Sequence, residues 1–153
     1  MISLYKLSGN RELAGFLSEL VLRAFGETPV ERVVVPVPPS PQRLRALGWD
    51  PVSEVLRCVG KRLSIQVLPL LARTEGMQQK ELGYEERREN ANSLFSVRLE
   101  GRSPQAPAFR ELGGSGVILF DDVFTTGATM SVCRRLLEAE GFKVTGSRTI
   151  AVD

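Results

Sequence analysis

Apolar runs and amphipathic stretches alternate along the chain, and they predict strands separated by helices. Apolar or β-branched runs predict strands over residues 32–37, 64–70, 117–120 and 143–152. Apolar residues at helical spacing predict helices over residues 10–26, 52–62 and 131–140. The run at residues 117–120 is wholly apolar, which is typical of a strand buried on both faces of a parallel sheet. The alternation predicts an α/β fold, with a mostly parallel β-sheet flanked by helices.

Two stretches interrupt this alternation. Residues 73–92 are charged and polar, and so long a polar segment within a compact domain predicts a lid. The alternative is a solvated helix tied by pairs such as Glu85 with Arg88, and both hold if the lid carries a short helix. Residues 101–116 are rich in Pro, Gly and Ser and predict a surface connection. No internal repeat or linker marks a second domain, so residues 1–153 are expected to form a single domain.

The overall composition is that of an ordinary soluble globular protein, and 153 residues suit one domain with one core. A net charge of +2 is too small to indicate nucleic acid as a partner, and no run of Lys and Arg appears. DNA binding is therefore neither supported nor excluded. No apolar run approaches the length of a membrane span, and the N-terminus lacks a signal-peptide pattern. We expect a cytoplasmic protein with no membrane partner.

The chain has no histidine and two cysteines, Cys58 and Cys133. The cysteines lie far apart and form no C-x-x-C pair, so the sequence predicts no zinc site built from this chain. Without histidine, any acid–base catalysis must use Asp, Glu, Lys or Tyr.

Two carboxylates, Asp121 and Asp122, follow the apolar run, and a loop of small and hydroxylic residues follows them at residues 125–129. In an open α/β sheet, ligands bind outside the carboxyl ends of the strands, and the N–H groups of a loop entering a helix bind phosphate. Carboxylates repel a phosphate but accept hydrogen bonds from sugar hydroxyls. A ribose 5-phosphate therefore matches both halves of the motif.

A plainer interpretation of the same motif is an ordinary buried strand, with Thr125 or Thr126 capping the next helix. Rival phosphate motifs are absent, since the chain has no G-x-x-x-x-G-K-[ST] and no G-x-G-x-x-G after a strand.

The apolar run at residues 32–37 passes into a proline-rich segment. Prolines have no N–H to give to a sheet, so the strand must end there and continue as a stiff loop, which suits the binding of a diphosphate. Arg43 follows, and the arginine fork pairs well with phosphate oxygens. The alternative is a solvated helix start that carries exposed arginines.

The motif VILFDDVFTTGAT resembles the phosphoribosyl-pyrophosphate (PRPP) signature of type I phosphoribosyltransferases. By that resemblance, Asp121 and Asp122 hold the ribose hydroxyls and take part in catalysis together with Lys80 and Arg88 of the lid. The implied PRPP-binding residues are Asp121, Asp122, Val123, Thr125, Thr126, Gly127, Ala128 and Thr129. The implied pyrophosphate-binding residues are Val37, Pro38, Pro39, Ser40, Arg43 and Arg87.

Outside this signature the chain resembles the ComF family, phosphoribosyltransferase-fold proteins related to amidophosphoribosyltransferase and named for bacterial competence. The family's VPVP followed by P-x-R-L and a glycine is matched at Val35, Pro36, Val37, Pro38, Pro41, Arg43, Leu44 and Gly48. Its Q-K-x-L, E-R-R-x-N and phenylalanine are matched at Gln79, Lys80, Leu82, Glu86, Arg87, Arg88, Asn90 and Phe95.

The chain departs from the family pattern at a few positions. The family's G-F-N-Q is Gly48-Trp49-Asp50-Pro51 here, an arginine before it is Leu47, and a proline before the Q-K pair is Gln78. These positions lie near the expected acceptor pocket. ComF proteins also typically begin with a four-cysteine zinc module and a further stretch, and this chain starts after both. We expect either a short relative or the later part of a longer chain.

The resemblance implies transfer of the phosphoribosyl group from PRPP to a nitrogen acceptor that the sequence does not identify. Pyrophosphate would be released, with Mg²⁺ bound mainly through PRPP. A homodimer is a further expectation. Two alternatives stay open: a non-catalytic sensor of PRPP, and an accessory factor for DNA uptake that rests on family analogy.

Overall fold

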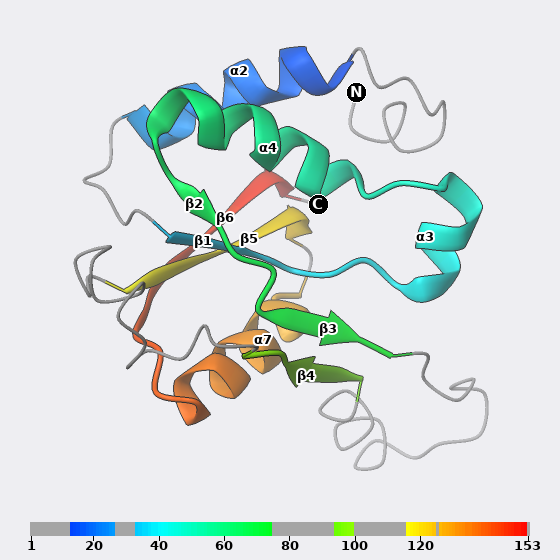
Figure 1. Cartoon of the computed structure of the whole chain (residues 1–153), viewed down its shortest axis with the longest axis vertical. Helices are drawn as coiled ribbons and strands as arrows, with labels where there is room; N and C mark the ends of the chain where they lie inside the picture. Colours follow the sequence, from blue (N-terminus) through cyan, green and yellow to red (C-terminus); the bar gives the residue numbers. More distant parts are fainter. Residues whose placement is uncertain (1–12, 27–32, 75–93, 100–115, 125, 153) are drawn as a thin grey trace.

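The computed structural model describes residues 13–26, 33–74, 94–99, 116–124 and 126–152. Along the chain, the described elements are α2 (Leu13–Gly26), β1 (Val33–Pro36), α3 (Pro41–Leu47), α4 (Pro51–Leu63), β2 (Gln66–Val67), β3 (Leu71–Arg73), β4 (Phe95–Val97), β5 (Val117–Phe124), α7 (Ala128–Ala139) and β6 (Val144–Val152) (Figure 1).

Four strands form a parallel sheet in the order β2-β1-β5-β6. β1 is central, with Val34 opposite Val67 of β2 on one side and opposite Ile118 of β5 on the other. β6 pairs with β5 from Val117 to Phe124. The predicted α/β fold, a mostly parallel sheet flanked by helices, is confirmed. The arrangement is compatible with the type I phosphoribosyltransferase fold.

The two faces of β5 pack against different helices, because side chains alternate along a strand. Val117 and Leu119 belong to a buried cluster with Cys133 of α7. Ile118 and Phe120 belong to a second buried cluster with residues of α2 and α4. Figure 1 shows α2 and α4 on one side of the sheet and α7 on the other. Burial on both faces explains why residues 117–120 of this strand are all apolar.

Beside the sheet, β3 and β4 form a small antiparallel pair. The strand predicted over residues 64–70 has the wrong bounds, because its place is taken by β2 and then by β3 from Leu71 onward. The N–H of Leu68 still donates to the Val34 carbonyl oxygen at 2.9 Å. The N–H of Leu70, the next possible donor to β1, donates instead to the Leu68 carbonyl oxygen at 2.8 Å, so the chain leaves the sheet here.

β5 extends further than its neighbour β1. β1 ends at Pro36, opposite Phe120, and the N–H of Val37 then donates to the Phe120 carbonyl oxygen at 2.8 Å. β5 continues, with Asp121 opposite Thr149 of β6. The strand predicted to stop before the acidic pair therefore includes both acids, because β6 keeps pairing with it.

Several predictions fall on the undescribed part of the chain. Lys80, Arg87 and Arg88 of the predicted lid lie outside the described residues, as does Thr125. Among the helices in the described ranges, none is both long and apolar enough to cross a membrane.

We expect Gly116→Ala to destabilise the fold far more than Gly48→Ala. Both glycines have positive φ, +104° at Gly116 and +70° at Gly48. A Cβ at Gly116 would lie 2.7 Å from the backbone carbonyl oxygen of Lys143, whereas one at Gly48 meets nothing within 4 Å. In urea denaturation, the free energy of unfolding should fall by about 1 kcal/mol for Gly48→Ala and by about 3 kcal/mol or more for Gly116→Ala. Equal losses would contradict the close packing at the start of β5.

Candidate functional site

The acidic pair lies on β5 just beyond the end of β1. Asp121 continues the side-chain direction of Leu119, toward α7, and Asp122 continues that of Phe120, toward the side covered by α4. Asp122 is buried, with 9% of its surface exposed, and Asp121 is half-buried.

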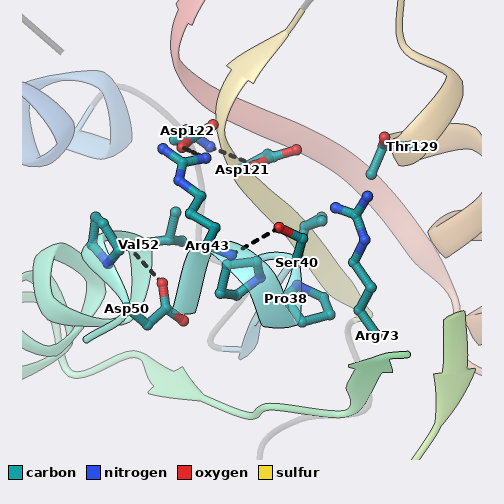
Figure 2. A pocket seen from close by; sticks show the side chains of 12 residues that line it. Pro38, Ser40, Arg43, Asp50, Val52, Arg73, Asp121, Asp122 and Thr129 are labelled. Carbon is teal, nitrogen blue, oxygen red and sulfur yellow. Dashed lines mark hydrogen bonds and ion pairs between the residues drawn. The ribbon is translucent and has the colours of Figure 1, made fainter. Parts of the chain in front are cut away.

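Each carboxylate has a close neighbour. Arg43 Nη1 lies 3.2 Å from Asp122 Oδ2, which forms an ion pair between α3 and β5. Asp121 Oδ1 accepts a hydrogen bond of 2.7 Å from the backbone N–H of Asp122. Figure 2 shows Arg43 extending to Asp122, with Asp121 beside them. The Arg43 guanidinium offsets the cost of burying the Asp122 charge.

A cavity of about 140 Å³ opens at the carboxyl ends of β1 and β5. Both acids reach it although they point to opposite faces of the sheet, because β1 no longer runs beside β5 at this level. The residues that line the cavity are Val37, Pro38, Pro39, Ser40, Arg43, Asp50, Pro51, Val52, Arg73, Asp121, Asp122 and Thr129. The structure thus brings the predicted loop at residues 37–40, Arg43, both acids and Thr129 together.

Local capping fixes the loop that carries Arg43. Ser40 is the N-cap of α3, and its Oγ accepts a hydrogen bond of 3.2 Å from the Arg43 N–H. Pro41 opens the helix and Gly48 closes it in the left-handed conformation, with φ of 70°. These two ends determine where Arg43 leaves the backbone.

The phosphate half of the predicted motif lies at the start of α7. This helix begins at Ala128, earlier than predicted, with Gly127 as its N-cap at φ of 72° and no side-chain capping bond from that residue. The Thr126 hydroxyl accepts a long hydrogen bond of 3.4 Å from the Ala128 N–H. Thr129 lines the cavity, whereas Thr126, Gly127 and Ala128 are not among the lining residues. The side chain of Val123 lies outside the described part of the structure.

Arg73 lines the cavity, although it falls within the segment predicted to be a lid. It is the last residue of β3, opposite Phe95 of β4, and its guanidinium carbon lies 5.1 Å from the centre of the Phe95 ring. Such a contact holds a guanidinium in place by cation–π attraction. In Figure 2 Arg73 extends toward Thr129. The apolar residues before it, Leu71 and Ala72, were the signal that it ends a strand.

Asp50 also lines the cavity, but its carboxylate already has a structural task. Its Oδ1 accepts a hydrogen bond of 3.0 Å from the Val52 N–H, and its Oδ2 accepts one of 2.7 Å from the Ser53 hydroxyl. Asp50 is thus the N-cap of α4. Asparagine caps helices equally well, so the aspartate in place of the ComF pattern's asparagine keeps this cap.

Each of two sides of the cavity carries one positive and one negative side chain. Arg73, Asp121 and Thr129 lie on the α7 side, and Arg43 and Asp122 lie on the side of α3 and α4. Such an arrangement can bind a ligand that has both anionic groups and hydroxyls. In the described ranges, no group of three or more His, Cys, Asp or Glu side chains is placed to hold a metal ion.

Cys133 lies behind the α7 side of the cavity and is fully buried. Burial raises the pKa of its thiol to about 12, the negative charge of Asp121 adds to the rise, and Arg73 opposes it. The thiol therefore stays protonated at neutral pH and is no nucleophile.

Comparison with known proteins supports the resemblance to the ComF family. No family model matches the chain. The competence protein ComFC of Streptococcus pneumoniae (strain ATCC BAA-255 / R6) is 30% identical over an alignment of 148 residues that covers 92% of this chain. The chain is thus similar to a ComF protein over most of its length, and the predicted resemblance to the ComF family is confirmed. It spans 57% of the length of that relative, so the similarity concerns the shared part.

The raised pKa of Cys133 predicts that stability falls in alkaline solution. The unfolded thiol loses its proton near its ordinary pKa of 9.0, whereas the folded thiol keeps it up to about 12. Because the unfolded state then binds fewer protons, the free energy of unfolding should fall by about 1.4 kcal/mol per pH unit between these limits.

The test compares the pH dependence of urea denaturation in the wild type and in Cys133→Ala under reducing conditions. Cys133→Ala should lose this part of the alkaline decline, and Cys58→Ala should keep it. Identical profiles for the wild type and Cys133→Ala would contradict the burial of the thiol.

Proposed function

We propose that this chain is a ComF-family protein that binds PRPP and transfers its phosphoribosyl group to a nitrogen acceptor, with release of pyrophosphate. The observation that carries the proposal is one cavity that gathers Asp121, Asp122, Arg43 and Arg73 at the carboxyl ends of parallel strands. This is where open α/β sheets bind ligands. The two carboxylates suit the ribose hydroxyls, and the two guanidiniums suit the phosphates.

The start of α7 supports a role in binding the 5-phosphate. Gly127 provides no side chain to cap the helix, and Thr129, in the first turn, lines the cavity. Backbone N–H groups and the positive end of a helix dipole favour an anion here. Thr126 and Ala128 would contribute through the same turn, and Thr125 and Val123 stay predictions.

The loop at residues 37–40 and Arg43 would hold the diphosphate. The loop is stiff because Pro38 and Pro39 have fixed φ, and Val37 is tied to β5 by its N–H. Arg73 adds a second cation to the same cavity. Roles for Lys80, Arg87 and Arg88 stay predictions.

Magnesium is the ion that the resemblance implies. Asp121 and Asp122 provide the oxygen atoms that Mg²⁺ prefers, although two carboxylates alone make no complete site, and the PRPP oxygens would supply the other ligands. When bound, the ion would neutralise negative charge on the diphosphate.

The residues of the chain would act by positioning and electrostatics. Asp121 and Asp122 would fix the ribose ring, and Thr129 would fix its phosphate. When the anomeric bond breaks, Arg43 and Arg73 would stabilise the charge that develops on the leaving diphosphate. Because the chain has no histidine, a general base would have to be Asp, Glu, Lys or Tyr, and none of these is assigned that role.

A second candidate function is non-catalytic binding of PRPP as a sensor in a competence-related process. The name of the pneumococcal relative, a competence protein, favours it. The same cavity would bind PRPP without turnover. A direct role in DNA uptake would instead require salt-dependent DNA binding, for which the net charge of +2 gives little support. The acceptor and a homodimer stay predictions.

The variant Asp121→Asn/Asp122→Asn should lose PRPP binding. Each change removes a charged acceptor while keeping the shape of the side chain, so the affinity measured by calorimetry with Mg²⁺ should fall by about a hundredfold. Pyrophosphate release in the presence of nitrogen acceptors should be lost in parallel. Binding by the wild type without release across an acceptor panel would favour the sensor.

The matched control is Glu138→Gln/Glu140→Gln, which removes two charges from the far end of α7, where both side chains are exposed. It should bind PRPP as the wild type does. Failure of the wild type to bind PRPP would refute the proposed function.

Arg73→Gln should also weaken PRPP binding, by about tenfold, because a charge-assisted hydrogen bond to phosphate is lost. The control is Arg57→Gln, an exposed arginine of α4 that pairs with Glu54 at 2.6 Å. An equal loss in both variants would mean that only net charge matters. No loss in Arg73→Gln would remove Arg73 from the site.

A further inference from the structure

Arg43 and Asp122 neutralise one another across the cavity. Their closest atoms, Nη1 and Oδ2, lie 3.2 Å apart, and their side chains are 35% and 13% exposed. Under the proposed function these two groups serve different parts of one ligand, the diphosphate and the ribose hydroxyls. Each must then exchange its present partner for the ligand.

We propose that the Arg43–Asp122 ion pair determines specificity, by making the site prefer a ligand that carries both a ribose diol and a diphosphate over either half alone. This inference rests on the proposed function and adds a reason for its selectivity. PRPP gives both groups a new partner. Ribose 5-phosphate displaces Arg43 from Asp122 without giving the guanidinium a diphosphate, and pyrophosphate draws Arg43 away from Asp122 without giving the carboxylate a diol.

The burial of the two side chains makes this exchange costly for a partial ligand. A charged group that loses its partner inside a protein pays the desolvation cost of that charge. Asp122 has 9% of its surface exposed, so little water can take the place of Arg43 around it. Arg43 is more exposed and can turn to solvent at a lower cost. Pyrophosphate should therefore be penalised more than ribose 5-phosphate.

The surroundings of Arg43 allow the exchange. α3 spans Pro41–Leu47 and contains no buried residue, so no core packing opposes a small shift of this helix. Ser40 and Gly48 hold its two ends, which keeps Arg43 beside the cavity in either arrangement. The long arginine side chain can then swing between Asp122 and a phosphate without unfolding the loop.

The test measures the affinity of PRPP, ribose 5-phosphate and pyrophosphate, each with Mg²⁺, by calorimetry on the wild type, Arg43→Met and Asp122→Asn. Arg43→Met should bind PRPP about tenfold more weakly and ribose 5-phosphate several-fold more tightly, since Asp122 is released from its pair. Asp122→Asn should bind PRPP more weakly and pyrophosphate about tenfold more tightly, since Arg43 is released. Arg57→Met, on α4, is the charge control and should change none of the three affinities.

The affinities of the two partial ligands in the two variants test this inference separately from the proposed function. Suppose that the wild type binds PRPP, that Arg43→Met binds ribose 5-phosphate no more tightly than the wild type, and that Asp122→Asn binds pyrophosphate no more tightly. The ion pair then plays no part in specificity, and the proposed function stands. If the wild type binds none of the three ligands, both the proposed function and this inference are wrong. Circular dichroism on each variant shows that the fold is retained.

Discussion

The different lengths of two neighbouring parallel strands create this site. β1 stops at Pro36, and among the described strands only β6 runs beside β5 from there to Phe124. On an ordinary central strand, consecutive side chains point to opposite faces and serve different layers. Past the end of β1 that separation no longer holds, so Asp121 and Asp122 reach one cavity from the two sides of the sheet.

Electrostatic balance makes such a polar cluster compatible with a small fold. The buried Asp122 faces Arg43, and Arg73 lies over the Phe95 ring on the other side of the cavity. Asp50 uses both of its carboxylate oxygens to begin α4. The pairings keep the cavity polar at a limited cost in desolvation, and the same charges are those that a phosphorylated sugar needs.

Sequence reasoning predicted most of the fold, because the apolar run of β5 and the proline after β1 determine the local backbone structure by themselves. The acidic pair and the Thr129 loop follow from the motif for the same reason. Arg73 was placed on the lid, because its position depends on the antiparallel pairing of β3 with β4, which joins distant residues. The contact between Arg43 and Asp122 was likewise invisible, since it depends on how α3 packs over β5.

The central claim is that PRPP binds in the cavity between the end of β1 and the start of α7. A crystal structure of the chain with PRPP and Mg²⁺ tests it most directly. We expect the ribose hydroxyls on Asp121 and Asp122, the 5-phosphate at Thr129, and Arg43 turned from Asp122 to the diphosphate. PRPP at another place would contradict the central claim, and PRPP in the cavity with Arg43 still on Asp122 would contradict the role of the ion pair in specificity.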